Sequence, residues 1–392
     1  MKIGIITINS AYNYGCVLQA YALERYLEKE GHDVKIINYR LPEIDNVYTI
    51  YTEKVRFSNP VAQKIYNALR KRKQLFQKRS TVIKAAKFEN FILHTLNTTD
   101  AYTSFPELVN SYNPADFDLL ITGSDQVWNG SITVGLRPAY FLDFDKVKSD
   151  AVRRISFASS IGKESLTNAE KAFFEHYLKN FDVISVREKS AQHLLKSLTD
   201  KKINLVADPT FLLEKSDFDE LVLKAGFTTP QAYSRKLAKP YILVHVIGKD
   251  KNVIQIAQAI SEKLNMPVIQ NRREKVFTNE ACSFSSAGPE EFIGLVRGAS
   301  YVVTNSFHAT VFSIIYHHDF ITIPHSKYPE RMANLLSELG LSDHLAPTLD
   351  VLPENFNIRN IDYAPVDKKF DEMRNSSRDF LQDCIQKAAV SK

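Results

Sequence analysis

The feature that most restricts the fold of this chain is the alternation of short apolar runs with segments of helical periodicity. Residues 2–8 are an Ile-rich run, residues 17–29 repeat apolar positions at helical spacing, and residues 32–39 are again largely apolar. Continuous apolar runs are typical of parallel strands buried on both faces, and parallel strands need a crossover helix between them. The pattern therefore predicts an α/β fold built from βαβ units.

The alternation occurs in two halves of similar size. Residues 214–239 lie between the halves, are mostly polar and are interrupted by proline, so we interpret them as a linker region. The pattern predicts two Rossmann-like domains facing each other across a cleft, with ligands at the carboxyl ends of the strands. The predicted boundaries are 1–213 for the N-terminal domain, 240–365 for the C-terminal domain, and 366–392 for a helix that packs back on the first domain.

Composition and charge exclude several classes of protein. The 50 Lys and Arg against 45 Asp and Glu leave a net charge of +5, which is too weak to indicate nucleic-acid binding. The cysteines at 16, 282 and 384 form no Cys-x-x-Cys pair, so neither a disulfide framework nor a metal site is expected. The chain opens without a signal-peptide pattern and contains no apolar run long enough to span a membrane. We therefore expect a cytoplasmic protein.

A basic segment, residues 54–87, interrupts the first half within an insertion of about residues 46–112. Its apolar residues recur at helical spacing, so we expect one or two helices with a basic face. A solvated surface explains such a run of charge. Peripheral contact with anionic headgroups at the inner face of a membrane is the alternative.

Residues 301–316 combine the end of a strand with the start of a helix. The apolar run stops at Asn305 and Ser306, either of which suits a helix cap, and helical spacing begins at Phe307. His308 then lies in the first turn, where free amides and the helix dipole attract phosphate or carboxylate. An imidazole beside an anion site is a candidate general acid. A histidine that only packs or caps fits the spacing equally well.

Two loops at predicted strand ends carry polar residues suited to binding a sugar. The first follows residues 2–8 and contains Asn13 and Gly15, with Gln19 in the helix after it. Gly15 lets a ligand approach the backbone, and the two amide side chains suit hydroxyl groups. An ordinary turn between a strand and a helix is the alternative.

The second loop follows residues 117–122 and reads Gly-Ser-Asp-Gln-Val-Trp-Asn from residue 123. Asp125 is a candidate general base, and Trp128 is a candidate for stacking on a sugar ring. Ser124 and Gln126 supply further hydrogen-bonding groups. A capped turn with a tryptophan packed in the core is the alternative.

Three basic residues are candidates for binding an anion in the cleft. Arg187 stands where a further predicted strand turns into a helix. Its guanidinium suits a carboxylate or phosphate of a ligand. The more common alternative for a single arginine is an ion pair with a nearby acid of the protein. Lys327 and Arg331 flank a loop after the last predicted strand, and they are expected near a phosphate held by the His308 helix.

Taken together, five blocks of residues resemble the polysaccharide pyruvyl transferase family. The resemblance extends to about Gly340 and implies a GT-B-like fold. It also implies transfer of a pyruvyl group from phosphoenolpyruvate to two hydroxyls of a sugar, giving a pyruvate ketal and phosphate, with no cofactor besides this co-substrate. The sugar is expected to belong to a bacterial capsule, exopolysaccharide or cell-wall precursor, often lipid-linked. The blocks are Asn13–Leu23, Gly123–Asn129, Arg187–Ser190, Asp208–Thr210 and Asn305–His308.

By position, the resemblance implies that His308 is catalytic and that Arg187 holds phosphoenolpyruvate. The N-terminal domain is expected on the acceptor side and the C-terminal domain on the donor side. Family members with this activity often have Arg-Leu before the histidine, where this chain has Ser306-Phe307, so other groups must complete the phosphate clamp. The expected donor-binding residues are Arg187, Asn305, Ser306, Phe307, Lys327 and Arg331.

Two other interpretations stay open at this point. One is a GT-B glycosyltransferase with a nucleotide-sugar donor. Many such enzymes hold the donor with two glutamates on the equivalent C-terminal helix, whereas residues 301–318 contain no acid. The other is a non-catalytic sugar-binding protein of polysaccharide assembly, which the Ser306-Phe307 pair keeps open.

Overall fold

The Ile-, Val- and Leu-rich runs form parallel strands, as predicted. The structure is a computed structural model that describes residues 1–41, 79–145, 152–227, 240–272, 274–324, 329–351 and 360–390. The N-terminal sheet has the order β2 (Asp33–Ile36), β1 (Lys2–Ile6), β3 (Leu119–Thr122), β4 (Arg153–Ser156). Isolated parallel bridges, such as that between Ser159 and Val186, continue it to the pair β5 (Ile184–Val186) and β6 (Ile203–Leu205). All these strands end at one edge, where the polar loops follow.

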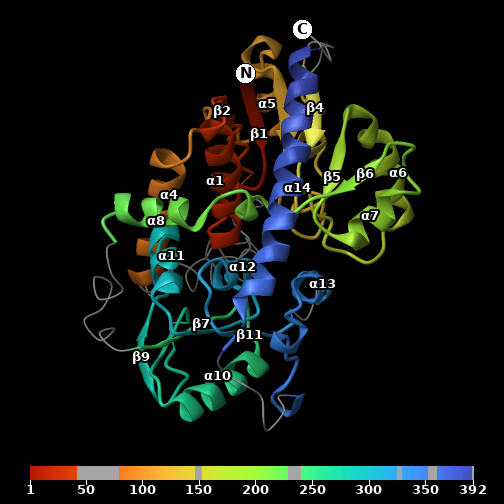
Figure 1. The fold of residues 1–392 in the computed structure, drawn as a ribbon. Helices are drawn as coiled ribbons and strands as arrows, with labels where there is room; N and C mark the ends of the chain where they lie inside the picture. Colours follow the sequence, from red (N-terminus) through yellow and green to blue (C-terminus); the bar gives the residue numbers. More distant parts are fainter. Residues whose placement is uncertain are drawn as a thin grey trace, which may run out of the picture.

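The second sheet lies in the C-terminal half and is also parallel. Its order is β11 (Phe320–Thr322), β10 (Tyr301–Thr304), β7 (Ile242–His245), β8 (Val268–Gln270), β9 (Glu280–Ser283). Every residue of β10 and β7 is buried, as expected for central strands covered on both faces. The two sheets belong to the two halves of the molecule in Figure 1, and the fold is the GT-B-like α/β arrangement expected from the sequence.

Helices connect the strands and cover both sheets. The N-terminal half has α1 (Tyr14–Lys29), α4 (Arg79–His94), α5 (Phe105–Ser111), α6 (Asn168–Tyr177), α7 (Lys189–Leu195) and α8 (Lys215–Lys224). The C-terminal half has α10 (Lys251–Leu264), α11 (Pro289–Arg297), α12 (Phe307–Ile315), α13 (Glu330–Leu339) and α14 (Tyr363–Val390). Short 3-10 turns include η4 (Pro209–Phe211), which follows β6. None of the helices in the described ranges is long and apolar enough to cross a bilayer.

The two halves meet through an apolar interface next to the polar strand ends. Tyr14, the first residue of α1, stacks on Phe292 of α11 with ring centroids 4.2 Å apart, and its hydroxyl donates to the Ala287 carbonyl. Stacked aromatic pairs of this kind add about 0.5–1.5 kcal/mol beyond their buried area. The interface therefore holds α1 of the first half against the elements that precede β10 and α12.

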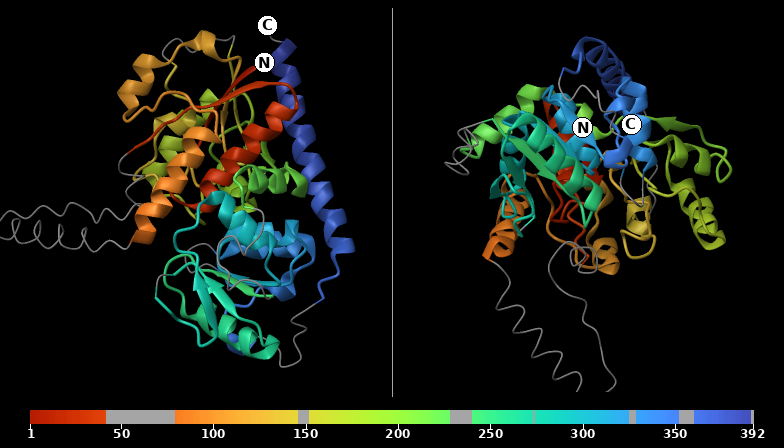
Figure 2. Two further views of the ribbon diagram at one scale, coloured as in Figure 1. Left: turned by 90° about the vertical axis from the view of Figure 1, so that its left-hand side faces the viewer. Right: turned by 90° about the horizontal axis from the view of Figure 1, so that it is seen from below.

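The C-terminal helix α14 packs back on the N-terminal half, as predicted. It crosses between the two halves, and both ends of the chain lie at one end of the molecule (Figure 1, Figure 2). The Ser377 hydroxyl accepts a 2.8 Å hydrogen bond from the Ala207 amide, and Arg374 Nε donates to the Phe211 carbonyl over 2.9 Å. These contacts fix the backbone on both sides of Asp208.

One sequence-based assignment changes within the described residues, and another is tested only in part. The predicted linker region contains α8, whose Phe218, Leu221 and Val222 are buried, because these residues recur at helical spacing on an otherwise polar segment. Of the basic segment 54–87, residues 54–78 lie outside the described residues. The rest belongs to α4, which buries Phe88 and Phe91, so a contact of the whole segment with a membrane stays a prediction.

Glu24 is an acid buried in α1, where its carboxylate accepts a 2.7 Å hydrogen bond from the Asn97 amide. Burial raises the pKa of Glu24 to about 8. The folded-state pKa lies above the unfolded value of about 4.3. The free energy of unfolding is therefore highest below about pH 4.3, and it falls as the pH rises from there through about 8. We expect Glu24→Gln, which keeps the acceptor oxygen, to raise the free energy of urea unfolding at pH 9 and to change it little at pH 4.

The matched control for Glu24→Gln is Glu175→Gln, because Glu175 is exposed on α6. This control should leave the pH dependence of unfolding as in the wild type. An equal effect of Glu24→Gln at pH 4 and pH 9 would contradict the expected linkage.

Candidate active site

His308 occupies the first turn of α12, as the sequence predicts. β10 ends at Thr304, and Ser306 caps the helix by accepting from the Ala309 amide over 3.4 Å. His308 is largely buried, and its Nε2 has no hydrogen-bond partner among the described residues. A buried polar atom left unpaired costs about 1–3 kcal/mol. The nearest carboxylate oxygen to Nε2 in the polar cluster is Oδ2 of Asp208, which lies 3.6 Å away, just beyond hydrogen-bond distance.

Gly15 is required because the His308 ring lies against the start of α1. A Cβ atom built on Gly15 would be 2.0 Å from Nδ1 of His308. Asn13 caps α1 by accepting from the Gly15 amide over 2.9 Å. The capped start of a helix in the first half therefore forms one wall of the histidine site in the second half.

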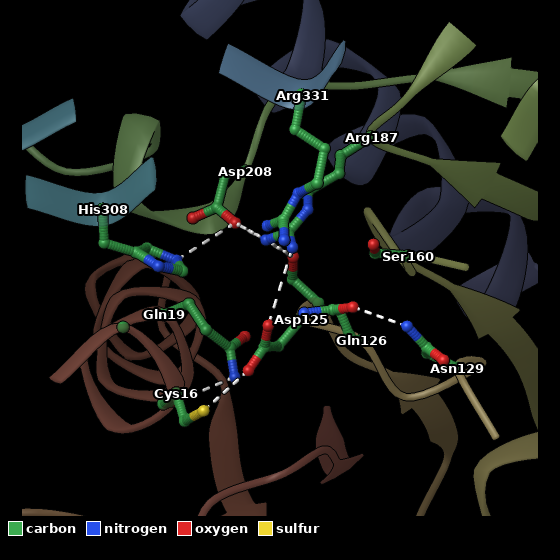
Figure 3. A network of polar contacts seen from close by, with 12 residues as sticks. Cys16, Gln19, Asp125, Gln126, Asn129, Ser160, Arg187, Asp208, His308 and Arg331 are labelled. Atoms are coloured by element: carbon green, nitrogen blue, oxygen red, sulfur yellow. Dashed lines mark hydrogen bonds and ion pairs between the residues drawn. The ribbon is translucent and has the colours of Figure 1, made fainter. Parts of the chain in front are cut away.

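Asp208 is the centre of the polar network in Figure 3. Its Oδ2 accepts from Nη1 of Arg187 over 2.6 Å and from the Ser124 hydroxyl over 3.1 Å, and it faces Nε2 of His308 at 3.6 Å. Its Oδ1 accepts from the amide and hydroxyl of Thr210. Burial opposes ionisation, but the His308 imidazole and the Arg187 guanidinium together hold the pKa of Asp208 well below its usual range. Asp208 is therefore a buried carboxylate that joins both halves at the histidine.

Two arginines lie over one aromatic ring. The Phe307 ring centroid is 5.1 Å from Cζ of Arg187, which follows β5, and 5.0 Å from Cζ of Arg331 on α13. Glu188 lies beside both arginines, 3.1 Å from Nε of Arg187 and 3.3 Å from Nε of Arg331. Burial and the neighbouring Arg187 lower the pKa of Arg331 to about 10. The aromatic face and the shared carboxylate thus offset the repulsion between two like charges.

Asp125 belongs to the same cluster, but its properties differ from those of a general base. Its φ of 67° is rare for a residue with a side chain, and such strained backbone is concentrated at functional sites. The Cys16 thiol donates to its Oδ2 over 2.7 Å, and Nη2 of Arg187 lies 3.6 Å from its Oδ1. Burial opposes ionisation, but Arg187 and His308 lower its pKa. A carboxylate held ionised in this way is a weak proton acceptor, so Asp125 is better suited to orienting Arg187.

Trp128 lies in the core, which corrects its assignment to sugar stacking. The residue is 1% exposed, its Nε1 donates to the Tyr140 carbonyl over 2.9 Å, and its ring stacks on Phe141. Phe174 and Phe181 cover it further. The Trp128 indole is buried here because the neighbouring helix α6 supplies an aromatic side chain to pack against it.

Three other residues predicted to bind substrate form hydrogen bonds within the protein. Gln19 is fully buried and donates to the Thr7 hydroxyl. Gln126 accepts a 2.6 Å hydrogen bond from the Asn129 side chain. Asn305 bonds the backbone of Ile247 through both its oxygen and its nitrogen. Through these bonds the three amides support the loops that carry the cluster, while Oε1 of Gln19 is buried without a hydrogen-bond partner among the described residues.

The structure therefore brings together some of the predicted residues and separates others. Gly15, Ser124, Asp125, Arg187, Phe307, His308 and Arg331 lie in or against one cluster, and Lys327 lies outside the described residues. Sequence reasoning missed Asp208, Glu188 and Cys16 as members of the cluster. The signal for Asp208 is the Asp-Pro-Thr sequence, in which the aspartate caps η4 at the end of a strand.

A cavity of about 300 Å³ lies beside the arginine pair. Arg187, Asp208, Phe307 and Arg331 line it, together with Met373 of α14. This volume suits a small ligand. Within the described ranges, no cluster of three or more His, Cys, Asp or Glu residues is placed to hold a metal ion.

The fold resembles solved structures of sugar-nucleotide and sugar-phosphate enzymes. UDP-GlcNAc 2-epimerase from Neisseria meningitidis, bound to UDP-GlcNAc, aligns with a TM-score of 0.54 at 10% identity over 99% of this chain and 100% of that one. UDP-GlcNAc 2-epimerase from Methanocaldococcus jannaschii gives 0.51 at 14% identity over 96% and 93%. The N-terminal domain of Candida albicans trehalose-6-phosphate phosphatase gives 0.51 at 10% identity over 99% of each chain. At these identities the likeness shows the fold alone.

Sequence comparison is more specific. None of the curated protein sequences compared with the chain matches it. The model of the family described as polysaccharide pyruvyl transferase matches residues 13–327, a range that includes Gly15, Asp125, Arg187, Asp208 and His308. The chain therefore belongs to the polysaccharide pyruvyl transferase family.

Proposed function

We propose that the protein transfers a pyruvyl group from phosphoenolpyruvate to two hydroxyls of a sugar, forming a cyclic ketal and releasing phosphate. The sugar is part of a bacterial surface polysaccharide precursor. The observation that carries the proposal is a cavity of about 300 Å³ lined by Arg187, Asp208 and Arg331, with Nε2 of His308 3.6 Å from Oδ2 of Asp208. Membership of the family supports a transferase acting in polysaccharide synthesis.

The donor is held by the guanidinium groups of Arg187 and Arg331, which line the cavity. Nη2 of Arg187 and Nε of Arg331 are buried and make no close hydrogen bond within the described part of the chain, with the carboxylates of Asp125 and Glu188 3.6 and 3.3 Å from them. Carboxylate and phosphate oxygens are the natural partners of guanidinium groups, and the first amides of α12 add a second set of donors. Arg331 takes the role of the arginine that family members often have at position 306.

His308 supplies the proton chemistry. It protonates the methylene carbon of phosphoenolpyruvate, the first sugar hydroxyl attacks the resulting oxocarbenium-like carbon, and the proton of that hydroxyl returns to the imidazole. The C–O bond to phosphate then breaks, the second hydroxyl attacks the same carbon, and its proton leaves with phosphate. Two hydroxyl protons thus end in the new methyl group and in phosphate. Asp208 orients the ring and stabilises the imidazolium formed in this cycle.

The alternative functions have less support from the site. A nucleotide-sugar glycosyltransferase shares the fold, but residues 301–318 provide no acid to hold a nucleotide sugar. A non-catalytic sugar-binding protein has no need for a buried histidine paired with Asp208 or for two arginines on one ring.

Phosphate release tests the proposed reaction. Phosphoenolpyruvate is incubated with the full chain and pyranosides that have free 4- and 6-hydroxyls, and phosphate is measured together with the ketal by mass spectrometry. Acceptor-dependent phosphate and a matching ketal are expected. No phosphate release, together with no calorimetric binding of phosphoenolpyruvate, would overturn the proposal.

Phe307 should affect the affinity for phosphoenolpyruvate, because its ring contacts the guanidinium groups of Arg187 and Arg331. Phe307→Leu keeps an apolar side chain but removes the aromatic face. We expect the KM for phosphoenolpyruvate to rise about 10-fold with a smaller change in kcat, because cation–π contacts contribute about 0.5–2 kcal/mol each. Phe307→Tyr is the matched control and should retain most of the affinity.

A double-mutant cycle separates this role of Phe307 from simple packing. If Phe307 acts by placing Arg331, the loss in Phe307→Leu/Arg331→Ala should be smaller than the sum of the two single losses. Strictly additive losses, or a Phe307→Tyr variant as weak as Phe307→Leu, would contradict the assigned role.

A further inference from the structure

A second hollow lies next to the donor cavity. It has a volume of about 540 Å³ and is lined by the loop of residues 162–167, by Glu170, by Ser190 of α7 and by residues 329–331 at the start of α13. Its size falls in the range of small-molecule sites. The residues around it come from both halves of the molecule, as expected for a site in the cleft of a two-domain enzyme.

Arg331 connects this hollow with the donor cavity. The residue lines both spaces, and its guanidinium lies over Phe307 beside Arg187. A ligand in the hollow and a donor in the cavity would therefore lie on two sides of one side chain. The two spaces therefore adjoin at Arg331, and the sites of two co-substrates must adjoin for their reacting atoms to meet.

The loop that lines the hollow is anchored directly on the catalytic cluster. Ser160, just before the loop, donates through its hydroxyl to Glu188, and its amide donates to the Asp125 carbonyl over 3.0 Å. Gly162 has φ +60°, and a Cβ there would lie 2.4 Å from Oε1 of Gln126. The position of the hollow is thus fixed relative to Asp125 and Glu188 by backbone and buried side chains.

The lining of the hollow has the chemistry of a sugar site. Ser165 and Ser190 offer hydroxyls, and Glu164 and Glu330 offer exposed carboxylates. Such groups accept and donate hydrogen bonds to the hydroxyls of a pyranose. Two of the side chains expected from the sequence to bind the acceptor, Trp128 and Gln19, are buried and do not offer such groups.

We propose that this hollow is the acceptor subsite and that it binds a pyranose with two free hydroxyls directed toward Arg331. The inference rests on the proposed function, because the donor cavity is defined by it. It assigns sugar recognition to the 162–167 loop and the start of α7, which neither the sequence motifs nor the comparisons indicate.

Saturation-transfer NMR tests sugar binding without the donor. The probes are methyl β-D-glucopyranoside, methyl β-D-galactopyranoside and methyl β-D-mannopyranoside at concentrations on the order of 10 mM, which detects even millimolar dissociation constants. The full chain is compared with Ser190→Trp and Ser165→Trp, which fill the hollow from two sides. The matched control is Ser197→Trp, because Ser197 is exposed and does not line the hollow.

Saturation transfer to at least one pyranoside is expected in the wild type and in Ser197→Trp, and loss of this transfer is expected in both hollow-filling variants. Phosphoenolpyruvate should bind all four proteins equally in calorimetry. Equal sugar binding in the wild type and the filled variants, or no transfer to any of the three sugars in the wild type, would overturn the inference. Sugar binding that the two variants remove, in a protein that releases no phosphate from phosphoenolpyruvate, would support the subsite while refuting the proposed donor chemistry.

Discussion

Replacing His308 with glutamine is expected to lower acceptor-dependent phosphate release from phosphoenolpyruvate by about 10²–10⁴-fold, the usual contribution of a positioned general acid or base. Glutamine has a similar length and keeps hydrogen-bonding groups near Asp208, but it cannot supply a proton. The KM for phosphoenolpyruvate should change far less than kcat, because the guanidinium groups of Arg187 and Arg331 remain over Phe307. Steady-state phosphate release at saturating donor measures the effect.

The matched control for this change is His176→Gln, since His176 is exposed on α6, far from the cluster in sequence. This control should keep full activity. If His308→Gln retained more than about a tenth of the wild-type rate, His308 would not act as a general acid of the usual strength. The Asp208–His308 pair would then have to be assigned to donor placement alone.

The second large effect is expected from Gly15→Ala, although it adds only one methyl group. The new Cβ would lie 2.0 Å from Nδ1 of His308, so the imidazole must leave its position facing Asp208. Misplacing a reacting group by about 1 Å can cost on the order of 100-fold in rate. Overpacking should lower the free energy of unfolding by only about 1–3 kcal/mol. Activity is therefore expected to fall much further than stability.

Phosphate release and urea unfolding of the same preparation separate these two effects, and a crystal structure of the variant should show a displaced ring. Gly130→Ala is the matched control, because the nearest atom to its added Cβ would be 3.3 Å away and the nearest atoms belong to Gly135 and Leu136. A Gly15→Ala protein of normal activity would show that the imidazole does not need this position.

The parts of the site that follow from local sequence signals could be predicted. The turn from β10 into α12 is such a part, because the strand run, the Ser306 cap and the helical spacing lie within one short stretch. The placement of Asp125 and Arg187 near each other also follows, since parallel strands deliver their carboxyl ends to one edge. Periodicity and capping therefore located the histidine and the first arginine.

The parts that depend on distant contacts could not be predicted. Asp208 meets His308 only when the two sheets face each other, and no local pattern records that pairing. Trp128 could face the cleft or the core according to where α6 packs, and in the fold it lies against Phe174 of that helix. The helix α8 escaped prediction because its few buried residues lie in a polar, proline-interrupted stretch.

The position of α14 has a consequence for when the enzyme becomes active during its synthesis. Domains generally fold as units as they leave the ribosome, the N-terminal one first. Here the backbone on either side of Asp208 receives hydrogen-bond partners at Ala207 and Phe211 from Ser377 and Arg374, which are made after both sheets. The nascent chain can form its sheets early, but the carboxylate that faces His308 gains its full support only once translation has passed through α14.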